Sequence, residues 1–313
     1  MWSDIFIRAL ESKSISEIRK VPKADLHNHA GLGYNLNRLN LLYNIRVSPP
    51  NPVMCDLYEM DAWIMNQLVP CLPATFSFID LLQLTVDEAI DDGVAVLDTS
   101  IDLWFIGKHC RGIVDACNEI SQICSRYSGK IEIRPEIGLN RTQKPDEIED
   151  VVFELIKSGV FKSIDLYGQE LEVKPDGFSK IWQYAGKYGL KRKAHAGEFD
   201  SAQMVRHAVE VLGLDEVQHG ISAAACAETM KWLAENKIVL NICPTSNVKL
   251  SRVQSIGVHP ARVLYDNGVR ITINSDDIAV FDTTTSQEFL KLYDTGLFTA
   301  RELDMIRNTG LVG

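Results

Sequence analysis

The run Ala24-Asp25-Leu26-His27-Asn28-His29-Ala30 decides the fold, because it opens a series of eight short apolar or β-branched runs. The other seven lie at Val94–Ile101, Ile131–Leu139, Ser163–Tyr167, Arg192–His195, Val217–His219, Ile238–Cys243 and Val269–Asn274. Segments with helical periodicity separate most of them, for example Ile79–Asp91, Glu147–Ser158, Gly177–Tyr188, Ala202–Leu212 and Ala224–Asn236. This alternation is typical of a parallel sheet with crossover helices. Eight strand–helix units predict an α/β fold, a (β/α)₈ barrel of the TIM type.

The length of the chain is compatible with one barrel or with two smaller domains. A chain of 313 residues is long enough for two domains of about 150 residues, but one closed barrel commonly takes about 250. We therefore expect a single domain over residues 1–313, with a helical lead-in at 1–22 and a lid or insert at 40–80 after the first strand. Within this insert, Ala62–Ile79 carries no formal charge over 18 residues. Pro70 and Pro73 interrupt it, which favours a buried helix–turn or an apolar lid over a membrane span.

The charge balance excludes some partners. Thirty-two basic and 42 acidic residues give a net charge of −10 and an isoelectric point near 5.2. Nucleic acids and anionic membranes both need a positive surface, so we expect neither as a partner.

The seven cysteines show no spacing typical of disulfides. Cys110, Cys117 and Cys124 recur every seven residues around the helical segment Gly112–Tyr127, too far apart along a helix for thiolates to share one metal ion. We expect them to be small buried side chains on one helical stripe, and reduced thiols fit a cytoplasmic protein.

Reactive side chains gather where the predicted strands end, which is where a barrel places its chemistry. The first run contains His27-Asn28-His29, the fifth ends at His195-Ala196-Gly197-Glu198, the sixth at Gln218-His219-Gly220 and the eighth at Asn274-Ser275-Asp276-Asp277. Two imidazoles two residues apart on a strand project from the same face and can bind one metal ion. Three imidazoles and a carboxylate suit a divalent cation, Zn²⁺ first among them, with an open position for water.

These stretches resemble the adenosine/adenine deaminase family of the metal-dependent amidohydrolase superfamily. The resemblance rests on Pro22–His29, Ile164–Gly168, His195–Glu198, His219-Gly220, Cys243–Asn247 and Ile273–Asp277, in the family's order from residue 20 to about residue 290. It implies a hydrolytic deaminase of an aminopurine base or nucleoside, in which hydroxide on a single zinc ion attacks the amino-bearing ring carbon and ammonia leaves.

The resemblance also implies roles for individual residues. The implied zinc ligands are His27, His29, His195 and Asp276. Glu198 would protonate ring nitrogen 1, and His219 would orient the zinc-bound water, with Asp276 beside it in the catalytic group. Asp277 would hydrogen-bond ring nitrogen 7, the backbone of Gly168 would contact nitrogen 3, and Tyr167 and His29 would lie beside the substrate.

Two departures from the family pattern bear on the substrate. Gly31 stands where nucleoside deaminases of the family carry an Asp that holds the ribose 5′-hydroxyl, and where adenine-type relatives carry a Glu. Tyr167 replaces a small residue before Gly168, which should narrow the pocket or supply a new hydroxyl. A modified aminopurine or another N-heterocyclic amine is therefore at least as good a candidate as adenosine. The alternatives are a different amidohydrolase reaction, such as hydrolysis of a cyclic amide, and a catalytically silent ligand-binding barrel.

The remaining candidates have plainer interpretations. His109 and His207 fall in or beside helical segments and are expected at the surface, while His259, before Pro260, should begin a helix. Ser246 and Asn247 follow the seventh strand and either contact the substrate or shape the turn. For Trp63 and Trp104, core packing is favoured over a place at the mouth of the pocket.

Overall fold

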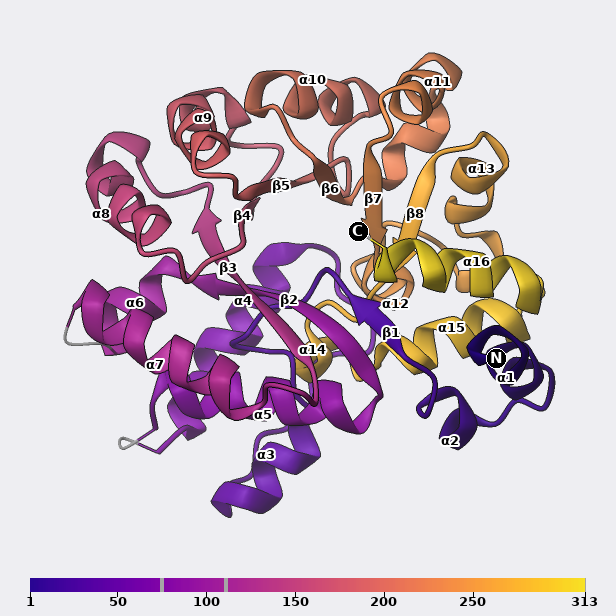
Figure 1. Ribbon diagram of the computed structural model, residues 1–313, viewed down its shortest axis with the longest axis horizontal. Helices are drawn as coiled ribbons and strands as arrows, with labels where there is room; N and C mark the ends of the chain where they lie inside the picture. Colours follow the sequence, from indigo (N-terminus) through magenta and orange to yellow (C-terminus); the bar gives the residue numbers. More distant parts are fainter. Residues whose placement is uncertain (74–75, 110–111, 313) are drawn as a thin grey trace.

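A computed structural model of the chain describes residues 1–73, 76–109 and 112–312 and contains one sheet of eight parallel strands (Figure 1). Each strand pairs with the next in sequence order. The strands are β1 (Lys23–Asp25), β2 (Val94–Asp102), β3 (Glu132–Asn140), β4 (Ser163–Tyr167), β5 (Lys191–Ala196), β6 (Glu216–His219), β7 (Val239–Ile242) and β8 (Arg270–Ile273). Figure 1 shows helices around the outside of the strands, and the predicted (β/α)₈ barrel is confirmed.

The helices fall into two groups. Those that lead into the barrel or connect its strands are α1 (Trp2–Glu11), α2 (Ile15–Ile18), α5 (Phe78–Asp91), α7 (Ile113–Arg126), α8 (Pro145–Lys157), α9 (Ser179–Lys187), α10 (Ala202–Leu212), α11 (Ala227–Glu235), α13 (Ala261–Asp266), α15 (Thr285–Asp294) and α16 (Ala300–Leu311). Shorter helices lie in the loops: α3 (Leu36–Tyr43), α4 (Leu57–Trp63), α6 (Leu103–His109), α12 (Pro244–Lys249), α14 (Ile278–Phe281) and the 3₁₀ or π turns η1 (Ile64–Leu68), η2 (Val69–Cys71), η3 (Pro175–Phe178), η4 (Ile221–Ala225) and η5 (Ile256–Val258). Over the described ranges, no helix is both long and apolar enough to cross a membrane.

The first strand is much shorter than its sequence run suggested. We predicted a strand over Ala24–Ala30, but β1 ends at Asp25, so His27 and His29 lie beyond it. The reason is the seam between β1 and β8, where side chains replace most of the backbone ladder. Leu26 N donates to Asn274 Oδ1 at 2.8 Å, and Ser275 N donates to Asp25 Oδ1 at 3.2 Å. A single bridge between Asn28 and Asp276 completes a nearly closed barrel.

Smaller differences concern helices and isolated side chains. The predicted helices at 177–188 and 224–236 are each divided into a 3₁₀ turn and an α-helix, η3–α9 and η4–α11. Cys117 is buried on α7 as expected and Cys124 is half-buried, while Cys110 lies outside the described residues. Trp63 is buried, but Trp104 is 43% exposed, so core packing was the wrong expectation for Trp104.

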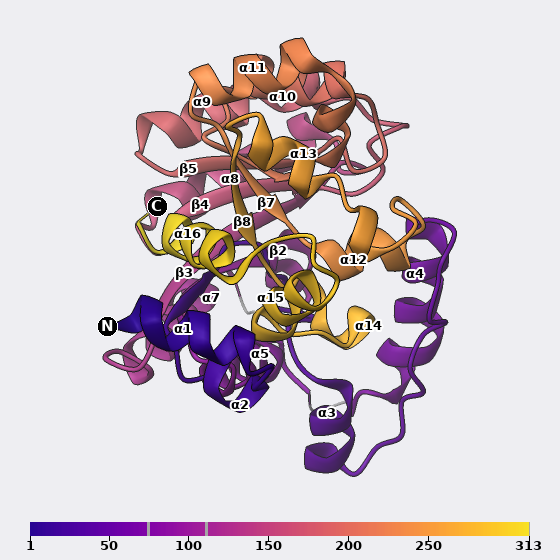
Figure 2. The ribbon, with the colours of Figure 1, turned by 90° about the vertical axis from the view of Figure 1, so that its right-hand side faces the viewer.

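The segment between β1 and α5 forms a small apolar cluster of its own beside the barrel. Tyr34, Leu39, Met54, Trp63 and Leu68 pack together there, against Leu250 after α12 and Val280 and Phe281 of α14. Figure 2 shows α3 and α4 on the same side of the molecule as α12 and α14. Two backbone contacts hold the segment in place, since Met54 N donates to Lys249 O at 2.6 Å and Ser251 Oγ donates to Met54 O at 2.7 Å. These hydrogen bonds join it to the loop that follows β7, and the apolar packing joins it to α14 after β8.

The interior of the barrel holds a buried ion cluster one layer below His195. Lys193 lies two residues before His195 on β5 and therefore faces the same side of the strand. Its Nζ is 2.6 Å from Asp98, 3.1 Å from Glu136 and 3.8 Å from Glu216, and it is fully buried with them. Burial raises the pKa of Glu136 to about 7 even with Lys193 beside it. The Lys193 ammonium therefore lies among carboxylates from β2, β3 and β6, and Lys191 gives Glu216 a second cation at 2.6 Å.

This cluster yields a stability prediction. Lys193→Met should lower the free energy of unfolding by about 3–5 kcal/mol at neutral pH, because it removes the buried ammonium that contacts Asp98 and Glu136. Without Lys193 the already raised pKa of Glu136 rises further in the folded state, which then binds more protons than the unfolded chain, so stability falls as pH rises. The loss should consequently be larger at pH 8 than at pH 5. Urea unfolding at both pH values measures it, with the exposed Lys187→Met on α9 as the control. An equal, small loss at both pH values would contradict the account.

Candidate active site

Four of the predicted site residues meet at the carboxyl end of the barrel, although they come from distant parts of the chain. His27 and His29 follow β1, His195 lies on β5 and Asp276 follows β8. His27 Nε2 is 3.1 Å from His195 Nε2, and Asp276 Oδ1 is 3.8 Å from His27 Nε2 and 3.7 Å from His29 Nε2. Ligand atoms of the three imidazoles all lie within 4.8 Å of one another. The structure thus brings together all four predicted ligands.

The acceptor groups that lie next to Nδ1 of two imidazoles favour a cation between the rings. His27 Nδ1 is 3.3 Å from the carbonyl oxygen of Asn241, and His195 Nδ1 is 3.1 Å from Asp165 Oδ2. Both partners only accept hydrogen bonds, so each Nδ1 carries the proton and each Nε2 presents a lone pair. Burial, together with the neighbouring imidazoles, keeps the pKa of His27 well below its usual range. Two buried lone pairs 3.1 Å apart repel each other unless a cation lies between them.

The other groups favour the same donor set. Although burial disfavours a charged His29, the carboxylates of Asp277 and Asp276 raise its pKa, and a position that attracts a proton also attracts a divalent cation. A second possible set pairs His27 and His219 with Cys243. Burial raises the pKa of the Cys243 thiol, which opposes the thiolate that a metal needs. The residues therefore fit a metal held by three imidazoles and a carboxylate better than one held by sulfur.

The backbone at the site is strained at two non-glycine residues. His219 has φ = 62° and Asp276 has φ = 60°, in the left-handed region that such residues rarely adopt. Gly197 also has a positive φ of 72°, and a Cβ there would approach Val205 Cγ2 to 2.2 Å. Only glycine fits this turn, which joins His195 to Glu198.

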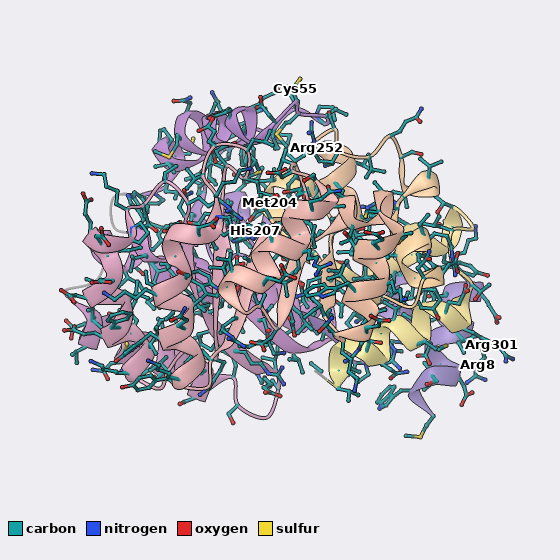
Figure 3. All side chains as sticks on the ribbon, turned by 90° about the horizontal axis from the view of Figure 1, so that it is seen from above. Arg8, Cys55, Met204, His207, Arg252 and Arg301 are labelled. Carbon is teal, nitrogen blue, oxygen red and sulfur yellow. The ribbon has the colours of Figure 1, made fainter. Side chains whose placement is uncertain are left out.

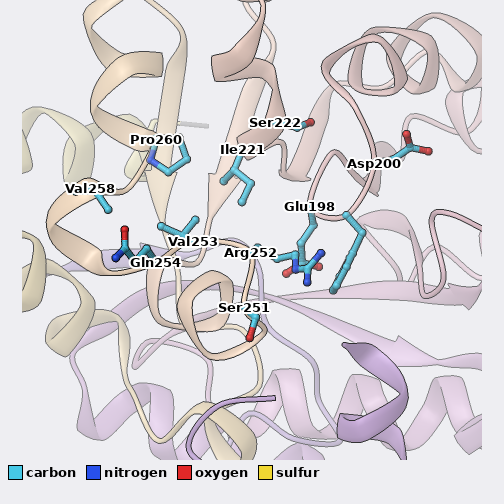
Figure 4. Close-up of a pocket in the computed structure, with 11 residues that line it drawn as sticks. Glu198, Asp200, Ile221, Ser222, Ser251, Arg252, Val253, Gln254, Val258 and Pro260 are labelled. Atoms are coloured by element: carbon cyan, nitrogen blue, oxygen red, sulfur yellow. The ribbon is translucent and has the colours of Figure 1, made fainter. Parts of the chain in front are cut away.

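Glu198 is a buried carboxyl group at the edge of the proposed metal site. Its Oε2 is 3.4 Å from His219 Nε2, and the backbone N–H groups of Gly197 and Glu198 donate to Glu170. Burial raises the pKa of Glu198 well above its usual range, and the nearby charges of Asp276 and Glu170 add to this. The group can therefore hold a proton at neutral pH. Figure 4 shows Glu198 near Arg252 in a pocket of about 470 Å³.

The predicted substrate contacts Asp277 and Tyr167 lie beside His29 and are not among the residues that line this pocket. Asp277 is buried, which raises its pKa to about 7, and the charge of Asp276 adds to this, whereas His29 opposes it. The ring of Tyr167 lies 5.6 Å from that of His29, and its hydroxyl donates to Asp102 at the end of β2. Gly168 follows Tyr167 with φ = 102°.

The structure also explains why Gly31 lacks a side chain. A Cβ at Gly31 would meet the ring of Phe105 at 2.8 Å. The place of the family's carboxylate is therefore covered by an aromatic ring from α6.

Three residues near the site were missed or underrated in the sequence. Asp165, two residues before Tyr167 on β4, contacts His195, and the alternation of strand residues could have revealed it. Asn247 donates to Glu198 Oε1 at 3.2 Å, and His259 contacts Asn247 at 3.2 Å, so His259 does more than begin a helix. His207 lies on α10 with its side chain 42% exposed, as predicted (Figure 3), and the side chain of His109 lies outside the described part of the structure.

Comparison with known proteins agrees with this arrangement. A family model described as adenosine deaminase matches residues 106–313. The chain is 35% identical to a putative adenosine/adenine deaminase of Treponema pallidum, over 92% of this chain and 96% of that protein. Among solved structures it is similar to an adenine deaminase of Arthrobacter aurescens, with a TM-score of 0.81, 22% identity and 93% of each chain covered. An amidohydrolase of Burkholderia ambifaria with bound zinc has a TM-score of 0.80 at 20% identity, over 94% of this chain and 86% of that one.

The share of the chain that the family model matches and the identity to the Treponema protein are large enough to assign the family. The solved structures share the fold of this chain. The chain belongs to the adenosine deaminase family, the hydrolytic deaminases of the amidohydrolase superfamily that act on C–N bonds other than peptide bonds.

Proposed function

We propose that this protein is a zinc-dependent deaminase of an aminopurine base or nucleoside. The observation that carries the proposal is the convergence of the His27 and His195 imidazoles and the Asp276 carboxylate near Glu198, a buried carboxyl group whose pKa is raised by burial. A metal-binding set and a carboxyl group that holds a proton are the two requirements of hydrolytic deamination. Here they share one buried space.

The residues proposed to hold the metal are His27, His29, His195 and Asp276. When bound, a zinc ion would supply the nucleophile by lowering the pKa of a water molecule from about 15.7 towards 7. Asp165 would hold the ring of His195 in the orientation that presents Nε2 to the metal, since a carboxylate behind a ligating imidazole fixes its tautomer.

The remaining residues would act on the heterocycle. Glu198 would donate its proton to ring nitrogen 1, which makes the neighbouring carbon more electrophilic and assists the attack of water. Asp277 would hydrogen-bond ring nitrogen 7, and the backbone of Gly168 would contact nitrogen 3. His219, 3.4 Å from Glu198 and 3.8 Å from Asp276, would orient the attacking water. The protons of the attacking water would balance the reaction, since one would restore Glu198 and the other would leave with the amino group as ammonia when the C–N bond breaks.

The surroundings of Gly31 and Tyr167 favour a substrate other than plain adenosine. Phe105 lies where a carboxylate for the ribose 5′-hydroxyl would stand, so that hydroxyl would lose a buried partner. The Tyr167 hydroxyl is already engaged with Asp102, which leaves an aromatic ring beside His29 as the wall of the pocket. A modified or differently substituted aminopurine fits this wall better than the unmodified nucleoside.

Glu198→Gln tests the acid. It keeps the size of the side chain but removes the transferable proton, so kcat should fall by about 10²- to 10⁴-fold while zinc content stays unchanged. Glu235→Gln at the exposed end of α11 is the matched control and should keep full activity. Steady-state kinetics and elemental analysis of each purified protein measure both quantities. Full activity in Glu198→Gln would refute the proposed mechanism.

A substrate panel tests the proposed substrate class. Release of ammonia is measured with aminopurine bases, their nucleosides, N-substituted analogues and other aminated heterocycles, next to cyclic amides read out by ring opening. We expect release from at least one substituted aminopurine, at a kcat/KM above that for adenosine. Ring opening of a cyclic amide without any deamination would favour the other amidohydrolase reaction. Inactivity across the whole panel would favour a silent ligand-binding barrel.

A further inference from the structure

A line of buried hydrogen bonds reaches His219 from the side away from the proposed metal. It begins at the backbone N–H of Ala261 in α13, passes through His259 and Asn247, and ends at His219 Nδ1. The three contacts measure 3.1, 3.2 and 3.1 Å. Asn247 is 0% exposed and both imidazoles are 1% exposed, so water does not replace any partner in the line.

The first contact fixes the tautomer of His259. A backbone N–H can only donate, so His259 Nδ1, which faces Ala261 N, has to accept. Burial lowers the pKa of His259 to about 3, so the ring is neutral and carries a single proton. That proton is on Nε2, which faces Asn247 Oδ1. His259 therefore donates to Asn247.

The second contact fixes the amide of Asn247. Its Oδ1 accepts from His259, so its Nδ2 faces the active site and has two hydrogens to donate. One is directed at Glu198 Oε1, 3.2 Å away, and the other at His219 Nδ1, 3.1 Å away. A reversed amide would set its own N–H groups against the Nε2–H of His259. Asn247 is thus a donor to both residues.

The third contact then sets the tautomer of His219. Because Nδ1 accepts from Asn247, the proton of a neutral His219 lies on Nε2, which faces Glu198 Oε2 at 3.4 Å and Asp276 Oδ2 at 3.8 Å. In a Ser-His-Asp triad a carboxylate sits at Nδ1 instead, which leaves Nε2 free to take a proton. In this protein the amide of Asn247 donates to Nδ1, so Nδ1 accepts and Nε2 donates, which is the reverse of the triad.

We propose that His259 and Asn247 are positioning residues that hold His219 in the Nε2–H tautomer, so that it donates a hydrogen bond to the attacking water and does not accept its proton. This inference rests on the proposed function, because it assigns His219 its part in that reaction. The same Asn247 amide fixes the carboxyl group of Glu198, so one side chain would align both the proposed acid and the proposed orienting group. The line of hydrogen bonds that sets the tautomer of His219 begins at Ala261, which is not one of the residues that line the metal site.

The test compares His259→Leu with His259→Gln. Glutamine can place an amide N–H near the former Nε2 and keep the donor to Asn247, whereas leucine removes it. Nitrogen NMR of the purified protein labelled with ¹⁵N-histidine reports which ring nitrogen carries the proton, and the signals of His219 are those lost in His219→Gln. Kinetics on the best substrate and metal analysis accompany each spectrum.

In the unsubstituted protein we expect a protonated Nε2 and an unprotonated Nδ1 in His219. His259→Leu should lose this preference and lower kcat by about 10- to 100-fold, with a much smaller change in KM and unchanged metal content. His259→Gln should retain both the tautomer and most of kcat. This difference between the two variants separates positioning from a general loss of folding.

A proton on Nδ1 of His219 in the unsubstituted protein would overturn the inference, and that spectrum requires no variant at this position to fold. An unchanged tautomer and kcat in His259→Leu would overturn it as well. Asn247→Asp provides an independent check, because a carboxylate at Nδ1 should move the proton of His219 from Nε2 to Nδ1. The absence of ammonia release from every aminopurine would refute the proposed function instead, while the spectrum would still decide the tautomer.

Discussion

The structure depends on one electrostatic constraint, the two imidazole lone pairs that face each other at His27 and His195. Their Nε2 atoms lie 3.1 Å apart in the interior, and each ring is fixed from behind by an acceptor at Nδ1. Neither ring can turn its proton inward without losing that partner. The arrangement is favourable only with positive charge between the two rings. The carboxylate of Asp276, which lies on a strained backbone, and the acidic surroundings of His29 also favour a cation at this place.

The barrel is built around this constraint in layers. At the carboxyl end, the seam between β1 and β8 keeps one backbone bridge, and the side chains of Asp25 and Asn274 replace the other bonds, which places His27 and Asp276 close to each other. One layer below, Lys193 joins carboxylates from three other strands and keeps the interior charges compensated. The segment with α3 and α4 packs against the loops after β7 and β8.

The sequence alone was sufficient for the barrel, because eight buried strands separated by amphipathic helices leave few other architectures. It also identified the residues that converge, because the chemistry of a barrel lies at its strand ends and four histidines fall at three predicted strand ends. It could not give the extent of β1, because Leu26 to Ala30 look like a strand, while the backbone N–H of Leu26 bonds to the side chain of Asn274, far along the chain. Nor could it place His259 next to Asn247. A histidine before a proline in a loop carries no periodic signal, and the direction of its hydrogen bonds depends on a backbone amide that only the folded chain brings to it.

The most direct test of the central claim is X-ray absorption at the zinc edge on the protein purified with one equivalent of zinc. We predict a first shell made only of nitrogen and oxygen, with imidazole nitrogens at about 2.0–2.1 Å. This shell should be absent from His195→Ala and intact in His207→Ala, whose imidazole lies on the surface of α10. A sulfur neighbour at about 2.3 Å, which would indicate Cys243, or an unchanged zinc shell in His195→Ala would contradict the account.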